Sequence, residues 1–479
     1  MNSSKPLQIA AAVLGLSLFL YFTYSHLQYF GNISLLGGIL LLEFVVIGLW
    51  KYDQRFFAAL MIAFVWAGLH VPMQGAWIAG RWLVLSSGAI VGYAVWAKNQ
   101  LRPFGTLHLM ALFCICAAFI SATVSLFVQM ASFKAISLLL LFLYCASGAR
   151  VAVIGREKRF FNGLVLGSEI AVYLTAICYF GLGESIWGNP NSLGAVMSIG
   201  LFPVLLWGWF TTDQPSVRLR RLGALALSAY LVFFSMARAG IASIVLVILM
   251  FCLFLKLYKL LLKIAMMALF SIAIVGMLAP AMLDSKREEL TDAVLYKGHK
   301  SEGLLGSRMS PWEKSITTIK EHPLFGTGYG TSPTGEDPGS NFGTINSSAE
   351  TSREHGSSFL TIAEWVGLLG VLPFVGLLSV TASNVWKVCV WMKRSGHPRH
   401  YSVPLAMVVL SGLVHASFED WLFAAGSYLC VYFWVFAFLL ADFAPGAVVV
   451  PSVTVVSRTP RPSPAGFGAA VSNPFVSNR

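Results

Sequence analysis

The stretch FFSMARAGIASIVLVILMFCLFLK, residues 233–256, decides the class of fold. From Ala239 onward it is almost entirely apolar for close to the ~20 residues that a helix needs to cross the hydrocarbon core of a bilayer. Its only charge before Lys256 is Arg238, at the junction with a preceding apolar run, residues 222–236. The pattern predicts two membrane-spanning helices that meet close to Arg238.

The composition extends this pattern to the whole chain of 479 residues. Hydrophobic residues make up 57% of the chain, charged residues make up 11%, and the mean hydropathy is +0.73. Soluble proteins have about 25% charged residues and about 45–50% apolar ones. An ordinary soluble enzyme and a disordered chain are therefore excluded. Roughly fourteen segments are long and apolar enough to span a bilayer, which predicts an all-α polytopic membrane protein with about 12–14 transmembrane helices.

The spacing of these segments divides the chain into four parts. Residues 1–280 are expected to hold transmembrane helices 1–11, and residues 357–444 are expected to hold helices 12–14. Between them, residues 281–356 form one large loop that precedes the last three helices. Residues 445–479 are rich in proline and serine without an acidic residue, which predicts a disordered tail.

The charge of the chain reports its orientation in the membrane. Lys and Arg number 33 against 21 Asp and Glu, a formal net charge of +12. On a soluble protein this excess suggests nucleic acid, but in a membrane protein the cytoplasmic loops collect Lys and Arg. If every predicted segment spans the membrane, the short outer loops carry only Arg81, Lys134 and Arg238. We therefore expect both termini in the cytoplasm, the loop 281–356 outside, and no nucleic-acid partner.

Two arginines on the outer side are candidate anion ligands. Arg238 has no acidic neighbour in the sequence, so its guanidinium is expected either to grip a phosphate-bearing substrate or to reach ordinary lipid phosphate. Arg308 is expected just ahead of a helix that Ser310 caps, Pro311 opens and Pro323 terminates. A fixed cation beside the exposed N–H groups of a helix start suits an anion. The alternative for Arg308 is a plain surface arginine.

His355 is the candidate for proton transfer. It lies where the large loop returns to the membrane, and a histidine can accept a proton from a hydroxyl near neutral pH. The alternative is a hydrogen-bonded structural histidine. Helical spacing places Glu364 far around from His355, so Glu354 or a residue from another segment is expected to orient the imidazole. The run Gly326-Thr327-Gly328-Tyr329-Gly330 lacks the lysine of a phosphate-binding loop and is interpreted as a turn.

No metal site is predicted from the sequence. No pair of histidines has the spacing of zinc ligands, and the cysteines all fall in or beside apolar segments, where they are expected to be packing residues.

Four sequence elements, in this order, resemble the O-antigen ligase and O-antigen polymerase superfamily, which consists of bacterial polytopic membrane glycosyltransferases. The first is GNPNSLG at residues 188–194, and the second is SMARAG at residues 235–240. The third is Arg308 with Trp312, followed by HPLFGTG at residues 322–328. The last is His355, leading into AEWVGLLG at residues 363–370. The resemblance spans about residues 185–385, and the earlier helices agree with the family only in number and polarity.

This resemblance implies an activity. Members of the family transfer a saccharide from a polyprenyl diphosphate carrier at the periplasmic face of the bacterial inner membrane, without metal or cofactor. Arg238 and Arg308 would hold the diphosphate, and His355 would be the base for the acceptor hydroxyl of a glycan, lipid or protein. Many members have asparagine after this histidine, where the present chain has Gly356. The substrate-binding set expected in full is Arg238, Arg308, Arg81, Trp312, Asn191 and Glu354.

Three functions are open to such a chain. The first is this glycosyltransferase, acting in O-antigen or exopolysaccharide biosynthesis as a ligase or a polymerase, with membrane lipids around it. The second is a transporter or flippase of a lipid-linked saccharide, which should show internal repeats that the sequence lacks. The third is a scaffold subunit of an envelope-assembly complex, in which Arg238 and His355 would be incidental. The long outer loop with its arginine and histidine favours the enzyme.

Overall fold

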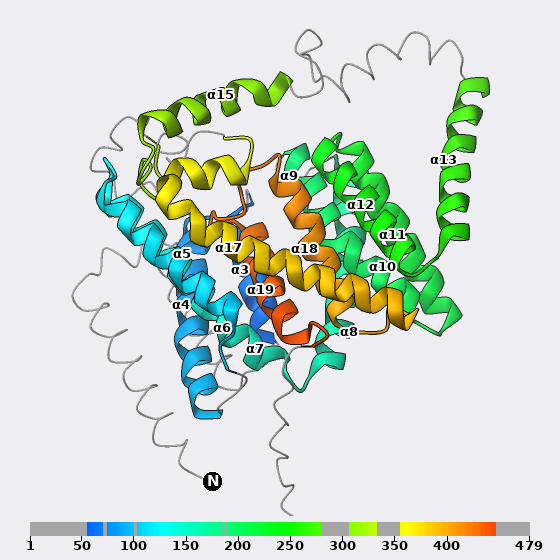
Figure 1. Ribbon diagram of the computed structural model, residues 1–479. Coiled ribbons are helices and arrows are strands. Elements are labelled where there is room, and N and C mark those ends of the chain that lie inside the picture. The colour runs from blue at the N-terminus through cyan, green and yellow to red at the C-terminus, as the bar shows by residue number, and fades with distance from the viewer. Residues whose placement is uncertain are drawn as a thin grey trace, which may run out of the picture. The chain divides into compact units, whose positions relative to one another are not determined.

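The computed structural model describes residues 55–69, 74–99, 103–183, 186–187, 189–278, 306–332 and 355–446. All regular secondary structure in these ranges is helical, which confirms the all-α prediction (Figure 1). Outside the described residues lie the two apolar segments expected before residue 55, most of the large loop with Glu354, and the C-terminal tail.

The helices follow the apolar segments expected from the sequence, and α15 is the helix expected within the large loop. They are, in chain order, α3 (Arg55–Ala67), α4 (Gln74–Asn99), α5 (Thr106–Thr123), α6 (Val128–Ala146), α7 (Gly148–Val153), α8 (Glu157–Ala176), the π-helix η2 (Ile177–Leu182), α9 (Pro190–Ala195), the π-helix η3 (Val196–Leu201), α10 (Phe202–Thr211), α11 (Pro215–Phe234), α12 (Arg238–Phe254), α13 (Tyr258–Leu278), α15 (Gly306–Glu321), α17 (Ser358–Ser395), α18 (Ser402–Ala416) and α19 (Tyr428–Phe443).

The chain is a multi-pass membrane protein. Among the described residues, five helical stretches are long and apolar enough to cross a bilayer: Thr106–Thr123, Val128–Val153, Glu157–Leu182, Pro190–Thr211 and Ser358–Ser395. Further apolar helices, among them α12, α18 and α19, are shorter.

The core lies around α18 and α19, which pack against each other. Every side chain of α19 from Leu429 to Leu440 is buried, as expected for a helix that is apolar on all sides. α18 also packs against α10, α12 and α17, and α17 packs along α5 (Figure 1). Residues 417–427, which connect α18 to α19, are therefore anchored at both ends by the most buried helices.

The π-helix η3 is held by side chains from these core helices. A π-turn leaves backbone carbonyls without their usual partners, and such groups must be satisfied inside the protein when water is excluded. Ser411 Oγ of α18 donates to the Ser198 carbonyl at 2.9 Å, and Tyr432 Oη of α19 donates to the Gly200 carbonyl at 2.8 Å. These bonds fix the segment that begins with α9 against the core.

A kink in α17 receives the glycine-rich turn. Gly367 has φ 66° and ψ 179°, which interrupts the helix after its first turns (Figure 1). The carbonyls of Glu364 and Trp365 accept hydrogen bonds from the backbone N–H groups of Thr327, at 3.0 Å, and Gly328, at 3.1 Å. A Cβ atom on Gly326 would lie 2.4 Å from the Trp365 carbonyl oxygen. The prediction of a turn at residues 326–330 is confirmed, and the turn packs on the helix that follows His355.

Candidate functional site

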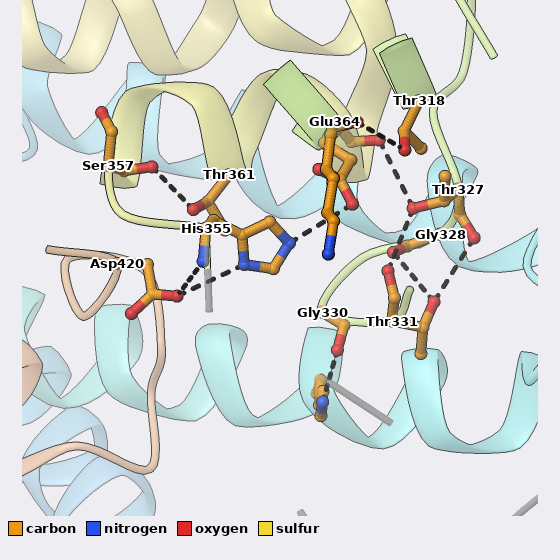
Figure 2. Close-up of polar contacts among 12 residues, drawn as sticks. Thr318, Thr327, Gly328, Gly330, Thr331, His355, Ser357, Thr361, Glu364 and Asp420 are labelled. Atoms are coloured by element: carbon orange, nitrogen blue, oxygen red, sulfur yellow. Dashed lines mark hydrogen bonds and ion pairs between the residues drawn. The ribbon is translucent and has the colours of Figure 1, made fainter. Parts of the chain in front are cut away.

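His355 lies between two carboxylates in the segment just before α17 (Figure 2). Its Nδ1 atom is 3.3 Å from Asp420 Oδ2, and its Nε2 atom is 3.3 Å from Glu364 Oε1. The backbone N–H of His355 also donates to Asp420 Oδ2, at 3.0 Å. Both ring nitrogens therefore have a carboxylate partner.

The expected separation of Glu364 from His355 was wrong, because it treated both residues as parts of one helix. α17 begins at Ser358, and Gly356 before it has φ +68°, a left-handed conformation that favours glycine. This left-handed turn directs the His355 side chain toward α17. Glu364, which lies on α17 about two helical turns after its start, can therefore contact the imidazole. The alternative expectation, a partner from another segment, is confirmed by Asp420 in the connection between α18 and α19.

The charges of this cluster reinforce one another. Burial lowers the pKa of His355, but hydrogen bonds and charge from Asp420 and Glu364 outweigh burial, so the pKa lies above the ordinary histidine value. Burial acts to raise the pKa of Asp420, yet its hydrogen bonds with His355 bring that pKa below the ordinary aspartate value. The pair is therefore an imidazolium beside a carboxylate over a wider pH range than either group alone would give.

Arg308 is tied to the same connecting segment through the residue next to Asp420. Its guanidinium donates to a carboxylate oxygen of Glu419. The Glu419 carbonyl in turn accepts from the backbone N–H of Ser358, at 3.0 Å, and from its hydroxyl, at 2.6 Å. The Glu419-Asp420 dipeptide thus contacts Arg308 with one side chain and His355 with the other.

The position expected for Arg308 ahead of a helix is corrected by the structure. α15 runs from Gly306 to Glu321, so Arg308 lies in its first turn and Pro311 lies inside the helix. The end expected before Pro323 is confirmed. Trp312, one turn beyond Arg308, donates from Nε1 to the Gly356 carbonyl at 3.1 Å. This bond fixes the start of α15 against the turn that follows His355.

Arg238 is the first residue of α12 and follows a tight bend. Met236 has φ 53°, and Gly194 of α9 packs so closely that a Cβ atom there would lie 2.3 Å from Ala237 Cβ. The two sequence elements at 188–194 and 235–240 are therefore in direct contact. The positive charge of Arg308 acts on Arg238, so the two guanidiniums lie within electrostatic range of each other.

The other three residues expected to bind substrate are Asn191, Arg81 and Glu354, and the two that the structure describes lie at different places relative to this site. Asn191 is half-buried in the first turn of α9, the helix that packs against the bend before Arg238. Arg81 lies on α4, where its Nη1 donates to the Gly426 carbonyl at 2.9 Å and its guanidinium lies 5.1 Å from the Trp82 ring. Arg81 thus contacts the other end of the segment 417–427. Glu354 lies outside the described residues.

Sequence reasoning missed Glu419 and Asp420. The signal was present, since two adjacent acids in a short connection between apolar segments are unusual in a chain with few charges. Among the described residues, no group of three or more histidine, cysteine, aspartate or glutamate side chains is placed to hold a metal ion. The arrangement offers two guanidiniums for an anion, next to a histidine–carboxylate cluster able to move a proton.

Comparison with known proteins gives a family match over about a third of the chain. Residues 223–375 match the family model described as O-antigen ligase. This range includes Arg238, Arg308 and His355, and it confirms the resemblance drawn from the sequence. No curated protein matches the chain.

Proposed function

We propose that the protein is a glycosyltransferase that moves a saccharide from a polyprenyl diphosphate carrier to an acceptor hydroxyl at the periplasmic face of the inner membrane. It would act in O-antigen or exopolysaccharide biosynthesis, as a ligase or a polymerase. The observation that carries the proposal is the Glu419-Asp420 dipeptide, which links Arg308 to His355 inside a site that includes Arg238.

The two arginines suit the donor. When the sugar leaves, negative charge develops on the diphosphate, and guanidiniums fixed in advance stabilise that charge without a metal ion. Arg308 pairs with Glu419, so the donor diphosphate would compete with this carboxylate for the guanidinium. The polyprenyl tail would remain in the bilayer, and the apolar helix α12, which begins at Arg238, would border it.

The cluster around His355 suits the acceptor. Forming the new glycosidic bond releases the proton of the acceptor hydroxyl, and a positioned proton acceptor contributes typically ~10²–10⁴-fold to such steps. The proposed placement of this site outside the cytoplasm is supported by the distribution of Lys and Arg, which also favours both termini in the cytoplasm.

The test is transfer by purified protein in liposomes. A synthetic saccharide on polyprenyl diphosphate is supplied with a candidate acceptor, and mass spectrometry follows the glycosylated product and the freed polyprenyl diphosphate. We expect both to form, and we expect EDTA to leave the rate unchanged. Movement of intact lipid-linked saccharide across the bilayer, without product, would instead support a transporter.

A deletion strain separates the two forms of the proposed activity. Single repeat units accumulating on the carrier would indicate a polymerase, because the units are made but not joined. Long chains accumulating on the carrier would indicate a ligase, because the polymer is complete but not transferred.

A further inference from the structure

The three members of the proton-handling cluster differ in their access to a substrate. The side chains of His355 and Glu364 are 1% and 0% exposed, whereas that of Asp420 is 32% exposed. Figure 2 shows Glu364 and Asp420 on opposite sides of the imidazole. An acceptor hydroxyl that approaches this cluster therefore meets Asp420 first.

The imidazole itself is closed to an acceptor. Both of its nitrogens have carboxylate partners at 3.3 Å, and the ring of Trp365 lies at 5.9 Å between centroids. A hydroxyl could reach a ring nitrogen only by displacing Asp420 or the buried Glu364. Displacing Glu364 would separate a buried carboxylate from the imidazole it contacts, which is costly.

Asp420 keeps one oxygen available. Its Oδ2 atom accepts from the His355 backbone and faces the ring, and the backbone N–H of Asp420 itself also bonds to the carboxylate, whereas Oδ1 has no hydrogen bond to another residue among those that the structure describes. The neighbouring residue, Glu419, contacts Arg308. An acceptor held at Oδ1 would thus lie close to the guanidinium expected to hold the leaving group.

We propose that Asp420 is the catalytic residue that takes the proton of the acceptor hydroxyl, through Oδ1. His355 is then a positioning residue, whose imidazole Glu364 contacts on its buried side. This inference rests on the proposed function. In the step, the acceptor oxygen forms a bond to the anomeric carbon of the donor sugar. The bond from that carbon to the diphosphate oxygen breaks, with its electron pair going to the diphosphate. The hydroxyl proton passes to Asp420.

The charge of the cluster agrees with this division of roles. Because His355 lowers the pKa of Asp420, the carboxylate stays ionised and ready to accept a proton. A weak base is sufficient if the transition state resembles an oxocarbenium ion, because the attacking hydroxyl becomes strongly acidic only as its bond to carbon forms. Glu364 balances the imidazolium from the buried side.

The test compares Asp420→Asn with His355→Gln in the liposome assay, with Asp213→Asn as control. Asp213 pairs with Arg399, and both side chains are largely exposed, so its variant should transfer like the wild type. Asparagine retains the shape of Asp420 and can accept from the His355 backbone, but it cannot take a proton. We expect Asp420→Asn to lose ~10²–10⁴-fold in turnover at every pH, with unchanged binding of polyprenyl diphosphate. Asp420→Glu should recover part of the rate.

The pH profile of His355→Gln separates the two roles. Removing the imidazolium raises the pKa of Asp420, so the acid limb of the profile should move to higher pH while measurable turnover remains. If His355 were the base, His355→Gln would have no turnover at any pH, and Asp420→Asn would remain active with its acid limb at lower pH. That result would overturn the inference but leave the proposed function intact. A wild-type protein without any transfer would overturn both.

Discussion

Replacing Gly367 by alanine should detach the glycine-rich turn from α17. The φ and ψ of Gly367 fall in a region that is essentially restricted to glycine, and forcing another residue there costs about 1–3 kcal/mol. A Cβ atom would also lie 2.4 Å from the carbonyl carbon of Leu324 and 2.5 Å from the backbone nitrogen of Gly326. These are backbone atoms, so the whole turn would have to move.

That movement would break the hydrogen bonds that Thr327 and Gly328 donate to α17. At about 0.5–1.5 kcal/mol each, two lost bonds add about 1–3 kcal/mol. The combined local cost is about 2–6 kcal/mol, with a middle value of about 4 kcal/mol. Since about 1.4 kcal/mol corresponds to a factor of ten, the middle value predicts that the Thr327 and Gly328 amides exchange with solvent roughly 10³-fold faster. Hydrogen exchange followed by mass spectrometry in detergent micelles measures this directly.

Gly376→Ala provides a matched control in the same helix. Its Cβ atom would meet the Met110 sulfur at 2.9 Å, and that flexible thioether can move aside. A helical glycine also gains up to about 1 kcal/mol from replacement by alanine. We therefore expect exchange at Thr327 and Gly328 to stay within a few-fold of the wild type. Equal exchange in the Gly367→Ala and Gly376→Ala variants would refute the reasoning.

Three further substitutions test the site and the scaffold. Arg238→Ala should abolish saccharide transfer while membrane insertion is unchanged, and full activity in a membrane extract would remove it from the donor site. Arg308→Lys should transfer at least tenfold more slowly, because an ammonium cannot reproduce the planar fork, whereas wild-type rates would indicate a simple surface charge. Asp442→Ala should lower the free energy of unfolding by about 3–5 kcal/mol, because it removes the carboxylate that Arg150, itself buried, binds with two nitrogens. A lower thermal midpoint in detergent would reveal this loss, and an unchanged midpoint would contradict it.

The helices of this protein could be predicted because each depends on its own residues. A segment long enough and apolar enough to cross the bilayer must form a helix there, since no water is available to satisfy its backbone. The predicted junction near Arg238 and the turn at residues 326–330 were also local, because glycines and small residues carry their own conformational preferences.

The contacts of the site could not be predicted in the same way. Whether Glu364 faces His355 depends on the single backbone conformation of Gly356 and on where α17 begins, which helical spacing alone does not give. Asp420 reaches His355 only because the connection from α18 to α19 folds back over the start of α17. Such contacts depend on three-dimensional packing between segments far apart in the sequence.

The Glu419-Asp420 dipeptide has a consequence for engineering the proposed activity. Because adjacent residues bind Arg308 of α15 and His355 before α17, inserting or deleting one residue here would break both contacts together. An exchange of acceptor specificity between related enzymes should therefore graft residues 417–427 together with α15 and the start of α17. Grafting the large loop alone would pair Arg308 of one protein with residues 417–427 of another, and the acidic residues of that segment need not match the arginine.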